Sequence, residues 1–195
     1  MIVLASSSPR RAELLRAAGI PFDVIAADID ERQRAGERPE VYARRLAGEK
    51  ARAVLPKATG RPVLAADTIV VVDGQTLGKP GDEADAARML RLLSGRAHEV
   101  LTAVALGDSA EAVEVRVATT IVEFAALSDA DVAWYVASGE PMDKAGAYGI
   151  QGLASRFVTR IEGSYSNVVG LPVALVYDIL KGYSERVSST GSPYL

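Results

Sequence analysis

The chain has 195 residues, of which 49% are hydrophobic, and a formal net charge of −3 at pH 7. This length suits one well-packed domain, and we expect that domain over residues 1–182, followed by a flexible polar tail over residues 183–195. The slightly acidic balance argues against general nucleic-acid binding, because such proteins are usually basic. The absence of cysteine excludes disulfides, thiolate zinc sites and a cysteine nucleophile, and the single histidine excludes a multi-histidine metal site. A hard cation held by carboxylates stays open.

No apolar segment of the sequence has the length of a membrane span. The longest candidate, residues 168–180, contains Pro172 and Asp178. The N-terminus has neither the basic segment nor the long apolar segment of a signal peptide. We therefore expect a cytoplasmic protein that does not bind a membrane.

The sequence begins with a short apolar segment and then a motif rich in hydroxyls and arginine, SSSPRR at residues 6–11. The spacing of Leu14 and Ala18 predicts a helix there, for which Ser8 suits the N-cap and Pro9 the first position. A helix N-terminus attracts anions, and guanidinium groups fit phosphate oxygens, so the motif is a candidate phosphate cradle. A capped helix whose arginines face water explains the same residues, and both interpretations stay open.

An acidic cluster, Asp28, Asp30 and Glu31, follows the second predicted strand. Three carboxylates at this spacing either face solvent or hold a divalent cation. Apolar spacing then predicts a helix over residues 39–55. Its Lys50 belongs either to an exposed charged face or to a phosphate site.

The most apolar segment, residues 63–72, predicts a central strand that Asp67 interrupts. Alternation along a strand puts Asp67 on the same face as Val63 and Ile69. An ionised carboxylate on such a face costs several kcal/mol unless it is paired with a cation or bound to a metal. Asp67 is therefore a candidate functional residue, and a structural ion pair is the alternative.

Further along, Asp73-Gly74 predicts a tight hairpin turn. Lys79, between a glycine and a proline, is either a positioned cation or a solvated turn residue. His98 at the start of the next strand is more typical of a structural histidine than of a ligand. The remaining pattern predicts helix 82–93, antiparallel strands 99–106 and 113–124, helix 129–137, strand 157–161 and helix 171–180.

Three glycines at three-residue spacing lie within DKAGAYGIQG, residues 143–152. Glycine lets a backbone approach a ligand closely, but a packed irregular loop uses it in the same way. This segment alone does not decide between the two.

Six segments together resemble the Maf-type nucleoside triphosphate pyrophosphatases. They are ASSSPRR at 5–11, DIDE at 28–31, ADT at 66–68, GKP at 78–80, LSGRAH at 93–98 and DKAGAYGIQG at 143–152. The resemblance extends from residue 1 to about residue 182 and implies an α/β inosine-triphosphatase-like fold, with a central mixed sheet and flanking helices. It also implies a cytoplasmic enzyme associated with septum inhibition, and it suggests a homodimer.

The activity that the resemblance implies is metal-assisted hydrolysis of dTTP or UTP between the α and β phosphates, with Mg²⁺ or Mn²⁺ as the cation. By the family pattern Asp67 is the proton acceptor. Three sets of further residues then receive roles: Arg10, Thr68 and Gln151 for base specificity; Ser6, Ser8, Arg11, Lys50 and Lys79 for phosphate; Glu31 and Asp67 for metal.

The glutamine in AGAYGIQG resembles the dTTP/UTP branch of this family. Gln151 can donate and accept hydrogen bonds at once, which suits the O4 and N3 edge of uracil or thymine. Two alternatives stay open: a 7-methyl-GTP pyrophosphatase, and a non-hydrolysing nucleotide sensor linked to cell division.

Overall fold

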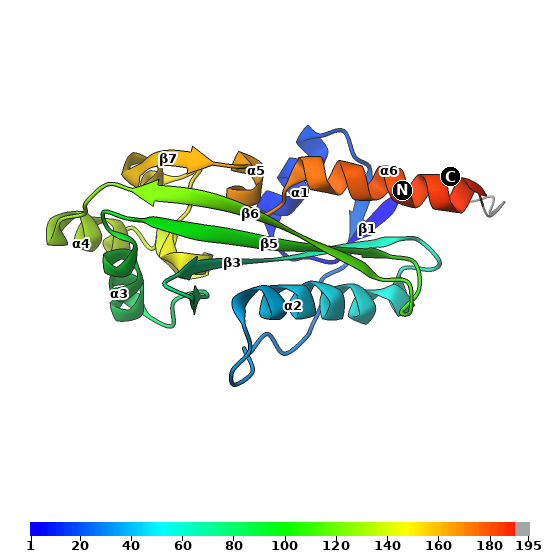
Figure 1. Ribbon diagram of the computed structural model, residues 1–195, viewed down its shortest axis with the longest axis horizontal. Helices are drawn as coiled ribbons and strands as arrows, with labels where there is room; N and C mark the ends of the chain where they lie inside the picture. The colour runs from blue at the N-terminus through cyan, green and yellow to red at the C-terminus, as the bar shows by residue number, and fades with distance from the viewer. Residues whose placement is uncertain (190–195) are drawn as a thin grey trace.

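The computed structural model describes residues 1–189, which form a seven-stranded mixed sheet flanked by helices (Figure 1). The strands are β1 (Ile2–Leu4), β2 (Phe22–Val24), β3 (Val63–Val72), β4 (Gln75–Leu77), β5 (Ala97–Gly107), β6 (Glu114–Phe124) and β7 (Val158–Glu162). Their order is β2-β1-β3-β5-β6-β7, and β4 pairs with β3. β1 is parallel to β2 and β3, whereas the other pairs are antiparallel. The expected mixed α/β architecture is confirmed.

Six α-helices and four short 3₁₀ helices occur in the described residues. The α-helices are α1 (Pro9–Ala17), α2 (Pro39–Val54), α3 (Glu83–Leu93), α4 (Asp129–Ala137), α5 (Tyr165–Val169) and α6 (Val173–Ser189). The 3₁₀ helices are η1 (Leu55–Lys57), η2 (Glu140–Asp143), η3 (Ala145–Ala147) and η4 (Leu153–Phe157). None of these helices is long and apolar enough to span a membrane.

The two faces of β3 meet different helices. Odd-numbered residues from Val63 pack in one core cluster with α2, whereas Leu64 and Ala66 pack with α1 and α6, and Val70 and Val72 with α3 and α4. Figure 1 shows α2 on one side of the long strands and α1 and α6 on the other. Because side chains alternate, the neighbours Asp67 and Thr68 face opposite sides of the sheet.

One edge of β3 is paired only at its two ends. β1 pairs with Val63 and Leu64, and β4 pairs with residues 70–72, while β5 follows the opposite edge throughout. Among the residues that the structure describes, no strand lies beside residues 65–69 on the first edge. Asp67 and Thr68 therefore lie at a gap in the sheet.

One sequence prediction needs correction near the C-terminus. The flexible tail predicted from residue 183 is helical as far as Ser189 in α6. Tyr183 of α6 is partly buried against the core, and its hydroxyl donates to Asp108 Oδ2 at 2.9 Å, which anchors this extension. The rest of the predicted tail, residues 190–195, lies outside the described residues.

Candidate active site

A cavity of about 670 Å³ opens at the gap in the sheet, within the size range of small-molecule sites. All the candidate site residues line it, although they come from segments far apart in the sequence. They are Ser6, Ser8, Arg10, Arg11, Glu31, Lys50, Asp67, Thr68, Lys79 and Gln151. The structure thus brings the whole predicted set together, while the role of each residue stays a prediction.

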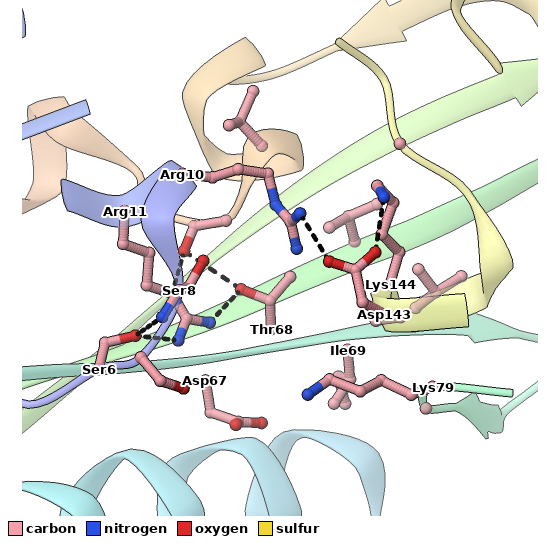
Figure 2. A pocket seen from close by; sticks show the side chains of 18 of the residues that line it. Ser6, Ser8, Arg10, Arg11, Asp67, Thr68, Ile69, Lys79, Asp143 and Lys144 are labelled. Carbon is pink, nitrogen blue, oxygen red and sulfur yellow. Dashed lines mark hydrogen bonds and ion pairs between the residues drawn. The ribbon is translucent and has the colours of Figure 1, made fainter. Parts of the chain in front are cut away.

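Arg11 on α1 reaches into the cavity beside Thr68 (Figure 2). Its guanidinium donates to the Gly170 carbonyl at 2.8 Å, to Ser6 Oγ at 3.2 Å and to Thr68 Oγ1 at 3.1 Å. Burial lowers the pKa of Arg11, and the charges of Asp67 and Glu31 act in the opposite direction. All three acceptors are neutral, so this cation has no direct carboxylate partner among the described residues.

The start of α1 adds further donors next to Arg11. Ser6 is buried, and its Oγ accepts the Ser8 N–H at 3.2 Å. Ser8 has the extended backbone of an N-cap and Pro9 occupies the first turn, as predicted, but the Ser8 side chain makes no capping hydrogen bond. The first N–H groups of α1 and the Ser8 hydroxyl are therefore available to a ligand.

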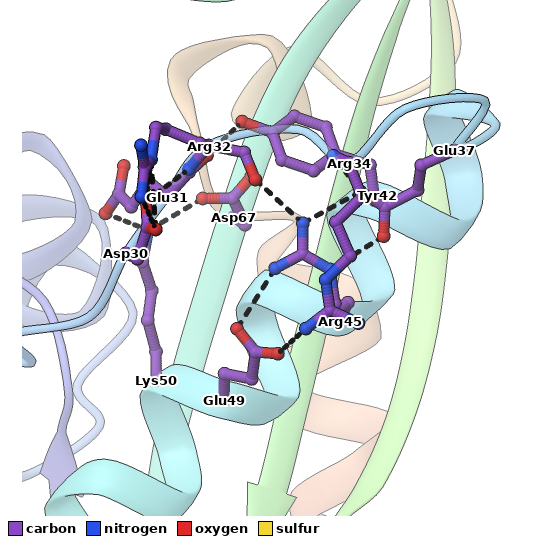
Figure 3. Close-up of polar contacts among 10 residues, drawn as sticks. All are labelled: Asp30, Glu31, Arg32, Arg34, Glu37, Tyr42, Arg45, Glu49, Lys50 and Asp67. Atoms are coloured by element: carbon purple, nitrogen blue, oxygen red, sulfur yellow. Dashed lines mark hydrogen bonds and ion pairs between the residues drawn. The ribbon is translucent and has the colours of Figure 1, made fainter.

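Lys50 of α2 joins the two acidic residues of the site. Its Nζ lies 2.7 Å from Asp67 Oδ1 and 2.8 Å from Glu31 Oε1, as Figure 3 shows. Lys50 and Asp67 are only 8% and 6% exposed. The cation that a carboxylate in an apolar strand requires is thus a lysine from the facing helix.

Glu31 is the more accessible of these two carboxylates. Burial acts to raise its pKa, but the hydrogen bond and charge of Lys50, with the charges of Lys79 and Arg11, outweigh it, so the pKa of Glu31 is lowered. In the described residues, no group of three or more acidic or histidine side chains is arranged to hold a metal ion. Glu31 and Asp67 nevertheless share one ammonium group, which places two oxygen ligands within reach of a single cation.

Lys79, which follows β4, and Arg10, on α1, reach the cavity from different parts of the fold. Lys79 is exposed, and in the described part of the chain it makes no hydrogen bond or ion pair; Figure 2 shows it directed toward the Asp67 side of the cavity. Arg10 Nη1 pairs with Asp143 Oδ2 at 3.1 Å, and Asp143 Oδ1 also pairs with Lys144 at 2.6 Å. Asp143 lies in the glycine-rich segment 143–152, but no role was predicted for it from the sequence.

The three predicted specificity residues differ in how firmly they are held. Thr68 Oγ1 contacts Arg11, Thr102 Oγ1 at 3.0 Å and the Gly170 carbonyl at 3.3 Å. Gln151 is exposed and makes no hydrogen bond with described residues. Thr68 is therefore part of a fixed network, whereas the Gln151 amide is available to a ligand.

Tyr42 is a site residue that sequence reasoning missed. It lines the cavity from α2, and its hydroxyl donates to the Glu31 carbonyl at 2.6 Å. The contact holds the loop that carries Glu31 against α2. No sequence pattern marks it, because it depends on how that loop folds back.

Comparison with known proteins finds relatives that are similar to this chain over nearly its whole length. A dTTP/UTP pyrophosphatase from Koribacter versatilis is 57% identical over 181 residues, which is 92% of this chain and 93% of the relative. The dTTP/UTP pyrophosphatase of Escherichia coli O157:H7 is 52% identical over 184 residues, covering 94% and 93% of the two chains.

A solved structure supports the fold. The Ham1 protein of Staphylococcus aureus matches with a TM-score of 0.52 at 17% identity, covering 93% of this chain and 98% of that one. This likeness agrees with the expected inosine-triphosphatase-like fold. The model of the family described as Maf-like protein matches residues 1–183, and with relatives of more than half identity over nearly the whole length, this chain belongs to the Maf-like family.

Proposed function

We propose that this chain hydrolyses dTTP and UTP to the monophosphate and pyrophosphate. The observation that carries the proposal is Arg11, a half-buried residue whose guanidinium donates only to neutral oxygens among the described residues, at one wall of a cavity. A charge taken out of water without a directly bonded counter-charge is costly, so a site of this kind favours an anionic ligand. The activity named for the curated relatives supports dTTP and UTP as that ligand.

The phosphates are expected to lie along the wall formed by the start of α1, Arg11 and Lys79. Helix N–H groups, a guanidinium and an ammonium group all stabilise phosphate oxygens. Ser6 and Ser8 add hydroxyls to this wall, and Lys50 is close enough to exchange a carboxylate for a phosphate oxygen. Phosphoryl transfer depends mainly on such positioning and charge stabilisation.

Asp67 is the proposed proton acceptor. Lys50 fixes its Oδ1, whereas its Oδ2 makes no hydrogen bond with any described residue and can accept a proton from water. The water oxygen bonds to the α phosphorus, the bond between that phosphorus and the oxygen that bridges to the β phosphate breaks, and pyrophosphate leaves. A positioned base of this kind contributes about 10²- to 10⁴-fold to a rate.

Glu31 and Asp67 are the residues that would hold Mg²⁺ or Mn²⁺. Two carboxylates that share one ammonium suit Mg²⁺, which usually takes one or two protein carboxylates together with substrate phosphates and water. When bound, such an ion polarises phosphoryl oxygens. Lys50 would then be released from the carboxylates toward the phosphates.

Three broader proposals follow from family membership. They are a cytoplasmic location, a homodimer and a link to septum inhibition. The mass of the purified protein in solution tests the second directly.

The test of the activity is a panel of triphosphates with the products identified by phosphorus NMR. UTP and dTTP with Mg²⁺ or Mn²⁺ are expected to give the monophosphate and pyrophosphate, and a chelator is expected to stop the reaction. Preferential cleavage of 7-methyl-GTP would overturn the choice of base, and orthophosphate as the first product would overturn the choice of bond. Tight UTP binding without turnover would favour the nucleotide-sensing alternative.

A further inference from the structure

A chain of hydrogen bonds behind the cavity wall joins α4, η2 and the segment that carries Gln151. Tyr135 is completely buried, and its hydroxyl donates to Glu140 Oε1 at 2.9 Å. The same hydroxyl accepts the Gly149 N–H at 3.1 Å. The other carboxylate oxygen, Glu140 Oε2, accepts the Leu153 N–H at 2.9 Å. One carboxylate and one phenol thus bind both ends of residues 149–153.

Two glycines make this approach possible. A Cβ added at Gly152 would lie 2.4 Å from both carboxylate oxygens of Glu140, and one added at Gly149 would lie 2.6 Å from the Lys144 side chain. Any other residue would push the backbone away from its anchors. Side chains of the protein itself, Glu140 beside Gly152 and Lys144 beside Gly149, therefore account for these two glycines, and a ligand need not.

Gln151 lies between these anchors. Its neighbour Ile150 is buried among core residues, while Gln151 itself is exposed at the cavity. Lys144 further steadies η2, because its Nζ donates to the Glu140 backbone carbonyl at 2.7 Å. The backbone on both sides of Gln151 is thus held at Gly149 and Leu153, and the Gln151 amide is left to meet a ligand.

We propose that Glu140, acting through the Tyr135 hydroxyl and the Leu153 N–H, is a positioning residue that fixes Gln151 for recognition of the pyrimidine base. The inference rests on the proposed function, because it assumes that Gln151 contacts the base. Glu140 does not line the cavity, so it acts through the backbone it holds. Burial raises the pKa of Tyr135, which keeps the hydroxyl protonated as a donor to Glu140.

The experiment compares Glu140→Ala and Tyr135→Phe with wild type, using steady-state kinetics with UTP and CTP and direct binding of inorganic tripolyphosphate. Both variants are expected to raise KM for UTP by about 10-fold, within the loss that a misplaced contact can cause, with kcat little changed. The preference for UTP over CTP falls by a similar factor, while tripolyphosphate affinity is unchanged. Because the two groups form one chain of bonds, the double variant is expected to lose little more than either single variant.

Two further variants separate positioning from general destabilisation. Glu140→Gln keeps an oxygen for Leu153 and is expected to restore part of the preference for UTP. Glu162→Ala, an exposed residue paired with Arg160 on β7, is the matched control and is expected to behave as wild type. If Glu140→Ala does not fold, Tyr135→Phe, which keeps the ring, carries the same test.

The outcomes distinguish this inference from the proposed function. Wild type without activity on UTP or dTTP would overturn the proposed function and the inference with it. A selective wild type whose Glu140→Ala and Tyr135→Phe variants keep both KM and base preference would overturn the inference alone. A parallel loss of tripolyphosphate binding would show a general structural role and would also overturn it.

Discussion

The two sides of the cavity are built in different ways. On the phosphate side, Arg11, Lys50 and Asp67 extend from α1, α2 and β3, and each is held by a side-chain contact at 3.2 Å or less. On the base side, residues 140–153 form short 3₁₀ helices with positive φ at Gly146 and Ala147. Residues of this segment line the cavity, and its backbone is held from behind by Tyr135 and Glu140.

This difference places the residues proposed for hydrolysis and those proposed for base recognition on different parts of the fold. Arg11, Lys50 and Asp67, which are proposed to act on the triphosphate, lie on regular elements whose positions are set by the core. Recognition of the base depends on an irregular segment, which can change without moving those charges. Substitutions on the phosphate side should therefore lower turnover or phosphate binding for every base, and those on the base side should change the ranking of bases.

Asp67→Asn should have the largest effect. The asparagine can still accept from Lys50, so folding and UTP binding are kept, but the proton acceptor is lost. We expect kcat for UTP and dTTP to fall by about 10³-fold, or about 4 kcal/mol, in the same proportion for each base. Asp178→Asn, at an exposed pair with Arg116, is the control. A kcat within tenfold of wild type would remove Asp67 from the proposed chemistry.

The pH dependence of the free energy of unfolding tests how His98 supports the segment on the base side of the cavity. His98 is buried, its Nε2 contacts the Tyr148 hydroxyl at 2.8 Å, and its Nδ1 has no hydrogen-bond partner within residues 1–189. Burial lowers the pKa of His98 to about 4, below its ordinary value near 6.5. The unfolded chain therefore binds a proton first as pH falls, so the stabilisation is complete above about pH 6.5 and is lost progressively down to about pH 4.

The expected loss across that window is about 3 kcal/mol in the free energy of unfolding. Chemical denaturation at several pH values measures it, and His98→Gln should remove this component of the pH dependence. Because the chain has one histidine, the assignment is direct. Identical pH dependence in wild type and variant would show that His98 does not control it.

Arg11→Met should have the next largest effect. Hydrogen bonds to charged groups contribute about 1.5–3 kcal/mol, so we expect kcat/KM for UTP and affinity for tripolyphosphate to fall by about 30-fold. The free energy of unfolding should change little, because the substitution leaves no carboxylate of the described part of the chain without its partner. Arg16→Met, which removes a cation over the Phe22 ring at the far end of α1, is the matched control. Unchanged tripolyphosphate affinity would contradict the anion site.

The sequence predicted much of the phosphate side from its own pattern. Residues 63–72 were recognisable as a central strand, and the structure has the same bounds. Asp67 on its apolar face required a partner, but the sequence could not show that the partner is Lys50, because α2 carries several cations and the choice depends on how the helix packs. The tight turn at Asp73-Gly74 was also predictable, and both residues have positive φ.

The base side could not be derived in this way. The place of Gln151 came from the family resemblance, because three-residue glycine spacing fits a ligand loop and a packed loop equally well. The contacts of Tyr135 with Glu140 and Gly149 depend on a chain reversal through η2 and η3 that no periodic pattern encodes. The helical course of residues 183–189 depends likewise on distant contacts, such as that of Tyr183 with Asp108.

Asp143→Asn should have the smallest effect, because it changes an ion pair that links the two sides. Asp143 Oδ2 holds Arg10 at 3.1 Å, with side chains 63% and 28% exposed, and such pairs are worth less than about 1 kcal/mol. If Arg10 turns to the nucleotide, removing its competitor should lower KM for UTP by about two- to threefold, with a smaller change at high salt. Asp129→Asn, at the exposed pair with Arg91, is the control. A rise in KM would mean instead that Arg10 and Asp143 stay paired and close the cavity over the bound nucleotide.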